Sequence, residues 1–420
     1  MKNLDRRKFI KNSTILTAGV GIMPHSLTVL KKGRAIGAND RIRIGIIGCG
    51  SRGNRVYMDG IHKHTEKMNV EIVAICDPWK VSREQANLKV KEWYGRDARL
   101  VSSYRDLLEL DNIDAVMIAS PDHLHTTHLE AAAQAGKHIY VEKPLAMDMD
   151  RLIRAVDAVK KAGVVVQVGT QLRSLPGIIG AKELISQGKL GQLSRVEECR
   201  NSQRPYWYSY LRDVKEEDVD WKEFLADRPY RPFRPDIYSA WYGYYDFSHG
   251  PIPNLGAHFI DIVHFVTGAT FPESCVCLGG TFTWKDEHQF TAPDCIQATW
   301  IYPEGFLVSS SNNLGNGNGS VRNFYGDKGT LQMPNWGKPT YNDEAAPRKD
   351  GSINGEHAVT PIDTPDHFLD WLQCIRDNKT PIAPIEAGYQ HAVAVLMAMK
   401  SYETGRRIGY DQKKRKLIEL

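Results

Sequence analysis

A glycine-rich loop, GCGSRG, has the spacing of a turn that binds the pyrophosphate of a dinucleotide. Gly48 permits the tight turn, Gly50 lets the backbone approach the phosphates, and Gly53 allows a helix to pack closely on the preceding strand. Free N–H groups and the dipole at the start of that helix favour negative charge. Ser51 and Arg52 lie inside the loop, and we expect them to contact the same cofactor.

An acidic residue stands where such a site needs one. The run VEIVAICD ends in Asp77, which lies 24 residues after Gly53. A carboxylate there accepts hydrogen bonds from the adenosine ribose and repels a 2′-phosphate. The sequence therefore predicts NAD as the cofactor in preference to NADP, although Arg52 and Arg55 leave room for both.

A lysine follows the strand-like run KHIYV. The triplet Glu142-Lys143-Pro144 comes directly after this run, and open α/β sheets bind ligands at the carboxyl ends of their strands. A lysine at that edge can hold a substrate hydroxyl or the nicotinamide ribose; the alternative is a surface cation. The proline can fix the turn, and an X-Pro bond can do so in the cis form.

Other polar residues follow neighbouring strand-like runs and are predicted to border the same cleft. His123 and His125 are expected to line the cofactor pocket rather than perform chemistry, and the alternative for His249 is a loop end. The further cofactor-side candidates are Ser120, Pro121, His123, His125, Glu142 and Gln171, and the substrate-side candidates are Arg173 and His249.

The pattern that must position these residues changes near residue 190. Residues 41–170 alternate short Val- and Ile-rich runs with helical stretches, which is typical of βαβ units and a parallel sheet. Later runs pair around turns such as Pro-Glu-Gly, which predicts hairpins. The predicted fold class is α/β, with an N-terminal doubly wound Rossmann sheet and a C-terminal α+β domain with an open, mainly antiparallel sheet.

We place the Rossmann domain at residues 39–165 and the α+β domain, for substrate binding and oligomerisation, at 166–420. Two amphipathic helices, at about 364–377 and 386–403, are predicted to close the chain and to pack back toward the Rossmann domain.

Residues 204–249 form an aromatic-rich insertion in the second domain. Residues 204–247 hold 14 of the 39 Phe, Trp and Tyr residues of the chain, which is too aromatic for a disordered loop. Flat rings with polar tips suit stacking on a sugar. A subunit interface explains the composition nearly as well.

The first residues are typical of an export signal. The stretch DRRKFIKNS precedes a weakly apolar segment, so residues 1–38 are predicted to be a twin-arginine signal read by the export machinery, which predicts a periplasmic protein. These residues hold eight of the 54 Lys and Arg residues and one of the 50 Asp and Glu residues, so a chain starting at Asn39 has a net charge of −3. Such a charge disfavours nucleic-acid binding.

Two further classes of site are not expected. No apolar run is long enough to span a membrane. The seven cysteines have no metal-ligand spacing, so we expect small buried residues and no metal.

Together these stretches resemble the glucose–fructose oxidoreductase/inositol dehydrogenase/MocA (Gfo/Idh/MocA) family over nearly the whole chain after the leader. The resemblance implies a Rossmann domain, an open-sheet domain, and redox chemistry at a sugar or cyclitol carbon between them. It is carried by the glycine loop and by residues 120–125, 136–147, 183–197, 255–268 and 368–408.

By position, the resemblance makes Lys143 and His258 the catalytic residues, with His258 taking the hydroxyl proton. The alternative for His258 is a helix cap. Asp261 lies on the same helix face, and it is predicted with Asn254 to bind substrate. Many members have an aspartate in place of Asn254; a carboxylate would raise the pKa of His258, whereas asparagine can only orient the ring.

Three functions remain open at this point. The first is a periplasmic, homo-oligomeric NAD-dependent oxidoreductase acting on a sugar, cyclitol or glycoside hydroxyl, with a tightly bound cofactor recycled in place because little free NAD exists outside the cytoplasm. The second is an NAD-dependent glycoside hydrolase that works by transient oxidation and elimination. The third is a non-catalytic sugar-binding protein, which the intact glycine loop, Asp77 and Lys143 argue against.

Overall fold

The computed structural model describes residues 37, 40–345 and 353–420. The predicted export signal, residues 1–38, lies outside the described residues except for Gly37, so it stays a prediction. No helix in the described part of the chain is long and apolar enough to cross a membrane.

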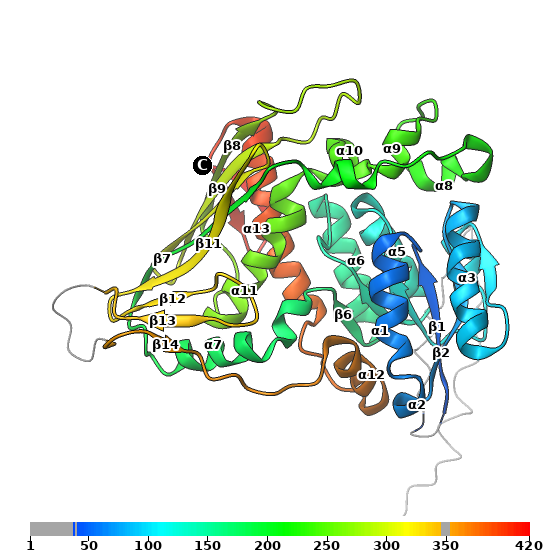
Figure 1. Cartoon of the computed structure of the whole chain (residues 1–420), viewed down its shortest axis with the longest axis horizontal. Coiled ribbons are helices and arrows are strands. Elements are labelled where there is room, and N and C mark those ends of the chain that lie inside the picture. Colours follow the sequence, from blue (N-terminus) through cyan, green and yellow to red (C-terminus); the bar gives the residue numbers. More distant parts are fainter. Residues whose placement is uncertain (1–36, 38–39, 346–352) are drawn as a thin grey trace, which may run out of the picture. The chain divides into compact units, whose positions relative to one another are not determined.

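The first half of the chain forms a six-stranded parallel sheet with the order β3-β2-β1-β4-β5-β6 (Figure 1). The order reverses between β1 and β4, which is where open α/β sheets bind ligands. Its strands are apolar on both sides because a separate core covers each face. The strands are β1 Ile42–Ile47, β2 Val70–Cys76, β3 Arg99–Val101, β4 Ala115–Ile118, β5 His138–Val141 and β6 Val166–Val168.

Helices supply those two cores. One face packs against α4, α5 and α6, and the other against α1, α2, α3 and the distant α12. Asp148 caps the start of α6 by accepting from the Arg151 N–H, and Gly163 ends it in the left-handed conformation. The helices are α1 Asp59–His62, α2 Thr65–Met68, α3 Lys80–Tyr94, α4 Tyr104–Leu108, α5 His125–Gln134, α6 Met149–Ala162 and α12 His367–Asp377.

The second half forms a ten-stranded sheet with the order β14-β13-β12-β11-β7-β10-β9-β8-β15-β16. Within this sheet β7 and β10 are the only described strands that pair in parallel, so the predicted Rossmann and mainly antiparallel sheets are both confirmed. The strands are β7 Leu193–Ser202, β8 Ser274–Gly280, β9 Cys295–Tyr302, β10 Phe306–Asn313, β11 Asn316–Gly326, β12 Thr330–Gln332, β13 Thr340–Asn342, β14 His357–Ala358, β15 Ile408–Asp411 and β16 Lys416–Glu419.

One face of this sheet is covered by helices, namely α7 Pro176–Ser186, α11 Ala257–Thr267 and α13 Ile385–Thr404 (Figure 1). The other face exposes apolar side chains, including Val276, Leu278, Ile301 and Val321. Exposed apolar patches often mark interaction surfaces. The predicted homo-oligomer nevertheless stays a prediction.

The end of the chain differs from the sequence-based expectation. Both predicted helices are present as α12 and α13, but a hairpin of β15 and β16 follows them. Ile408 pairs with Cys275 of β8, so the hairpin extends the edge of the large sheet. Strands this short depend on a distant partner, and a local pattern does not reveal that partner.

The aromatic-rich insertion folds into short helices rather than a loop. It runs above the carboxyl ends of the Rossmann strands (Figure 1) and includes α8 Trp221–Leu225, α9 Pro235–Ser239 and α10 Tyr245–Ser248. Trp207, Phe224 and Phe247 are buried in a small core of its own. This core explains the aromatic composition and fixes the segment above the glycine loop.

Candidate active site

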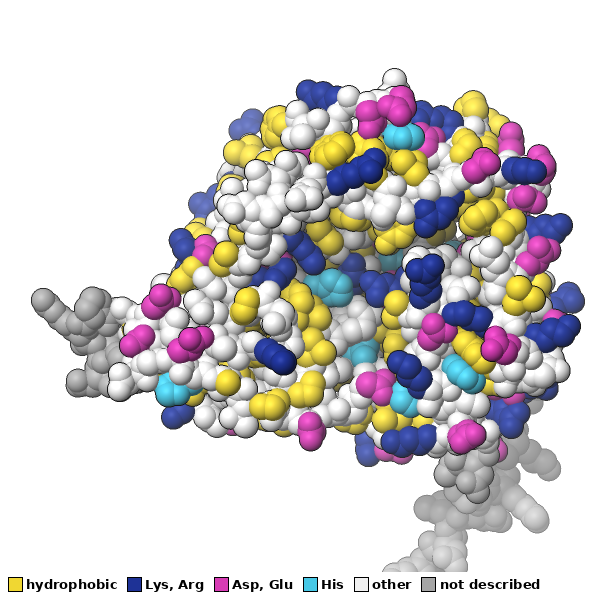
Figure 2. Space-filling view, viewed as in Figure 1, with side chains coloured by type: hydrophobic (Ala, Val, Ile, Leu, Met, Phe, Trp, Pro, Cys, Tyr) yellow, Lys and Arg dark blue, Asp and Glu magenta, His cyan; other side chains and the backbone are white. Residues whose placement is uncertain are grey.

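A cleft of about 630 Å³ opens at the carboxyl ends of the Rossmann strands. Its floor is the glycine loop and the strand ends, and its roof is the aromatic segment together with β7 and the start of α11. Figure 2 shows a hollow in the middle of this face, with cationic and histidine side chains on its walls. The volume is in the usual range for sites that bind small molecules.

The glycine loop fits a pyrophosphate. Gly48 has a φ of 93°, and a Cβ there would lie 2.6 Å from the Ala119 carbonyl carbon. A Cβ on Gly53 would lie 1.9 Å from the carbonyl oxygen of Gly48. A Cβ on Gly50 would meet no atom within 4 Å, so this backbone faces open space at the cleft. The loop thus excludes side chains at two positions and presents bare backbone at the third.

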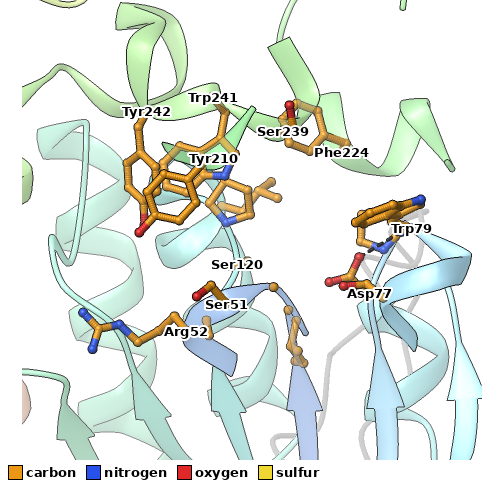
Figure 3. Close-up of a pocket in the computed structure, with 18 of the residues that line it drawn as sticks. Ser51, Arg52, Asp77, Trp79, Ser120, Tyr210, Phe224, Ser239, Trp241 and Tyr242 are labelled. Carbon is orange, nitrogen blue, oxygen red and sulfur yellow. Dashed lines mark hydrogen bonds between the residues drawn. The ribbon is translucent and has the colours of Figure 1, made fainter. Parts of the chain in front are cut away.

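Asp77 lies at the far end of the same cleft, beside Trp79 and away from Arg52 (Figure 3). Its carboxylate accepts from the backbone N–H of Cys49 at 2.6 Å and of Trp79 at 2.8 Å, and from the Tyr238 hydroxyl at 3.3 Å. Burial raises its pKa, and these hydrogen bonds oppose the rise. The carboxylate is therefore held rigidly at the position expected for a ribose.

We expect Asp77→Ala to weaken NAD more than NADP. The change removes a hydrogen-bond acceptor for the ribose and also a source of repulsion for the 2′-phosphate. NAD therefore loses binding affinity without any gain, whereas for NADP the relief of repulsion offsets the loss. Titrations of both cofactors, followed by protein fluorescence, measure the two affinities. Equal changes for the two cofactors would place Asp77 away from the ribose.

Lys143 connects the two domains. It follows β5, its peptide bond to Pro144 is cis, and its Nζ donates to the Asn254 carbonyl oxygen at 2.7 Å. The residue is only 7% exposed, although it lines the cleft. Burial lowers the pKa of Lys143, while Glu142 and Asp122 act to raise it. The amine therefore releases a proton more readily than an exposed lysine does.

Glu142 lies behind the cleft wall and holds other site residues. It accepts from Gln171 Nε2 at 3.0 Å and from the Lys143 N–H at 3.0 Å, and it pairs with Arg52 at 3.3 Å. Burial acts to raise its pKa, but Arg52 and Lys143 outweigh burial, so the net pKa is lowered. A permanently charged Glu142 can thus fix Arg52 at the mouth of the glycine loop.

His258 lines the cleft from the start of α11. Burial and the nearby cations Lys143 and Arg52 hold its pKa well below the ordinary value. The ring is therefore neutral near pH 7 and can accept a proton. In the described part of the chain its Nδ1 is buried without a hydrogen-bond partner. The Asn254 amide nitrogen donates to another group, so an orienting role of Asn254 toward this ring stays a prediction.

That amide contacts a carboxylate that the sequence reasoning missed. Asp122 Oδ2 accepts from Asn254 Nδ2 at 3.4 Å and from the Ser248 hydroxyl at 2.9 Å. Asp122 is 3% exposed, and burial raises its pKa to about 7 against the opposing effect of Lys143. The sequence held one signal for Asp122. Because asparagine replaces the aspartate that many family members have at position 254, a carboxylate near Lys143 had to come from another segment of the chain.

The structure brings one group of the predicted residues to the cleft and leaves the others behind its walls. Those that line it are Gly48, Gly50, Ser51, Arg52, Asp77, Ser120, Pro121, Lys143, Asn254 and His258. Those that do not are Gly53, His123, His125, Glu142, Gln171, Arg173, His249 and Asp261.

The residues behind the walls have other contacts. Arg173 and Asp261 form a buried ion pair at 2.8 Å. His123 contacts the Phe224 carbonyl, and His125 lies between the carbonyl oxygens of Ser120 and Pro144, each at 2.8 Å. His249 ends α10 with a φ of 55°. Direct roles for these side chains in binding substrate or cofactor stay predictions.

Aromatic rings form the roof of the cleft. Figure 3 shows Tyr210, Trp241 and Tyr242 above the glycine loop, and Trp241 stacks on Tyr242 with ring centroids 3.7 Å apart. All three line the cleft. This placement favours contact with a ligand over the alternative of a subunit interface.

The described side chains include no group of three His, Cys, Asp or Glu residues that could hold a metal ion. All seven cysteines are free thiols.

Family models match both halves of the chain. Residues 42–170 match an oxidoreductase family with an NAD-binding Rossmann fold, and residues 182–410 match the C-terminal alpha/beta domain of the same family. The chain belongs to the Gfo/Idh/MocA oxidoreductase family. The NAD-binding assignment of the first domain and the oxidoreductase class are thereby confirmed.

Individual relatives cover only part of the chain. It is 32% identical over 174 residues to a glycosyl hydrolase family 109 protein of a Shewanella species, with 37% of each chain covered. It is 28% identical over 200 residues to inositol 2-dehydrogenase/D-chiro-inositol 3-dehydrogenase of Lactiplantibacillus plantarum, covering 46% of this chain and 54% of that protein. The chain thus matches about half or less of the length of these relatives.

Solved structures extend the match to nearly the whole fold. The WlbA dehydrogenase of Bordetella pertussis, determined with NADH and UDP-GlcNAcA, has a TM-score of 0.64 at 23% identity. The match covers 88% of this chain and 99% of WlbA. At this identity the likeness supports the fold alone.

Proposed function

We propose that this member of the oxidoreductase family oxidises or reduces a hydroxyl-bearing carbon of a sugar, cyclitol or glycoside. The observation that carries the proposal is the meeting of Lys143 and His258 at the end of a cleft whose floor is the glycine loop. Relatives named for inositol support a polyhydroxylated substrate.

The chain's own residues have separable roles in this proposal. The loop around Gly50, with Arg52 and Asp77, would hold NAD, which when bound supplies the hydride acceptor. Lys143 Nζ holds the substrate hydroxyl oxygen. His258, kept neutral by burial and by nearby cations, takes the hydroxyl proton. The aromatic roof excludes water and packs on the apolar face of the sugar ring.

A second candidate is glycoside cleavage without net oxidation. Transient oxidation of the sugar acidifies a neighbouring C–H, the glycosidic group is eliminated as that proton is lost, water adds in its place, and the hydride then returns from the reduced cofactor to the sugar. The match to a glycosyl hydrolase family 109 protein favours it. The same lysine and histidine serve either reaction. The predicted export signal belongs to this proposal too, because an exported enzyme would need to keep and recycle its cofactor.

We expect the purified protein to turn over members of a sugar and glycoside panel, with cofactor absorbance and sugar release followed together. A lasting absorbance change identifies a dehydrogenase, and sugar release without one identifies the cleavage reaction. Protein that binds NAD but changes no panel member would contradict both activities.

A further inference from the structure

Among the described residues, Arg200 is the partly buried arginine of the cleft that has no ion pair; Arg55 and Arg212 also line the cleft without one, but both are exposed. Arg200 lies on β7, on the same side of the strand as the buried Glu198, and it lines the cleft. Within residues 40–345 and 353–420, no hydrogen bond or ion pair of its guanidinium is found. Burial lowers the pKa of Arg200, and the charge of Glu198 offsets this loss of hydration only in part.

The neighbouring buried and partly buried cations have partners in the protein. Arg322 pairs with Glu198 at 2.8 Å, and Arg52 pairs with Glu142 at 3.3 Å. Lys143 Nζ donates to the backbone oxygen of Asn254, and the side-chain amide of Asn254 donates to the carboxylate of Asp122. Arg200 is therefore the partly buried arginine of this cluster that forms no ion pair among the described residues.

Arg200 belongs to the reacting end of the cleft rather than to the pyrophosphate end. It lies on β7, and β7 forms part of the roof of the cleft together with the start of α11, which carries His258. The glycine loop and Asp77, in contrast, belong to the Rossmann domain. An anion that neutralises Arg200 would thus be part of the substrate and not a phosphate of the cofactor.

We propose that Arg200 binds a carboxylate on the substrate, so that the enzyme acts on a sugar acid rather than on a neutral sugar. The proposal rests on the oxidoreductase function proposed above. A carboxylate places a single negative charge beside the one partly buried guanidinium that has no ion pair. A planar guanidinium also matches a carboxylate through two parallel hydrogen bonds.

The test compares sugars that differ only in charge. Affinity and turnover are measured for D-glucuronate and D-galacturonate, for their methyl esters, for glucose and galactose, and for glucose 6-phosphate. Affinity is read from protein fluorescence with NADH present. We expect the acids to bind roughly 10- to 100-fold more tightly than their esters, the scale of hydrogen bonds to charged groups. Arg200→Gln should abolish that difference, and Arg200→Lys should retain part of it.

Arg195→Gln is the matched control. Arg195 lies on the same strand but is exposed and pairs with Glu197 at 2.9 Å, so its loss should leave the preference for acids intact. Thermal unfolding of each variant verifies that it folds.

Three outcomes overturn the carboxylate proposal: tighter binding of neutral sugars, a preference for the phosphate ester, or equal affinity for acids in wild type and Arg200→Gln. Turnover of neutral sugars alone would leave the proposed oxidoreductase function standing. Arg200-dependent binding of acids without turnover would support the subsite and count against the proposed reaction.

Discussion

Lys143→Met is expected to lower turnover by about 10²–10³-fold, the usual scale for losing one hydrogen-bond donor to the reacting oxygen. The variant should still bind NAD, because the glycine loop and Asp77 lie on other strands of the Rossmann sheet. Lys143 Nζ, in contrast, donates to the carbonyl oxygen of Asn254, which belongs to the second domain. Its loss therefore removes the group that holds the substrate oxygen while leaving the cofactor cradle intact.

Steady-state rates and an NAD titration on the same preparation check this result. Lys143→Arg keeps the charge but changes its reach, so it should recover little of the rate. Lys89→Met is a matched control, since Lys89 pairs with Asp59 at 2.7 Å and does not line the cleft. Near-normal turnover in Lys143→Met would remove the lysine from the reaction.

The cofactor end of the site was predictable because its chemistry depends on local spacing. Gly48 and Gly53 have conformations or close approaches that side chains forbid, and Gly50 leaves its backbone open to the phosphates, so these requirements fix their positions in the sequence. Asp77 directly follows strand β2, and Lys143 lies just after strand β5. Residues that follow parallel strands come together at one edge of the sheet, so the strand pattern alone placed them in one cleft.

The substrate end was less predictable because its residues meet only through tertiary packing. Asp122 and Asn254 are 132 residues apart, and their contact depends on how α11 docks against the Rossmann domain. Arg200 is part of an ordinary alternating strand, and only the structure shows that its neighbours already have partners. The same limit hid the final hairpin, whose strand β15 pairs with β8.

Asp122 is placed to influence the pKa of Lys143 without contacting the substrate. It is buried behind Asn254 and is not among the residues that line the cleft. Its carboxylate raises the pKa of Lys143, and Lys143 in turn lowers the pKa of Asp122. Because burial brings the pKa of Asp122 to about 7, the field on the lysine changes near neutral pH. We therefore assign Asp122 as a positioning residue.

Asp122→Asn is expected to move the basic limb of the pH–rate profile downward by roughly one pH unit, the scale for losing a nearby opposite charge. The sign follows from the charges: an ionised carboxylate stabilises the ammonium, so its removal lowers the pKa of Lys143 and the ammonium is lost at lower pH. The ionisation near pH 7 should also disappear, because its source is gone.

Two further variants separate charge from packing in this result. Ser248→Ala removes a hydrogen bond at 2.9 Å that lowers the pKa of Asp122, so the ionisation near pH 7 should move upward. The carboxylate itself remains and is ionised at alkaline pH, so the basic limb should stay close to that of the wild type. The double variant Asp122→Asn/Asn254→Asp exchanges the amide and the carboxylate across a 3.4 Å contact, so a negative charge returns beside Lys143. We expect it to move the limb back toward higher pH. If Ser248→Ala shifts the limb as far as Asp122→Asn does, or if the double variant shifts it no closer to the wild type, then Asp122 acts through packing and its charge does not tune the lysine.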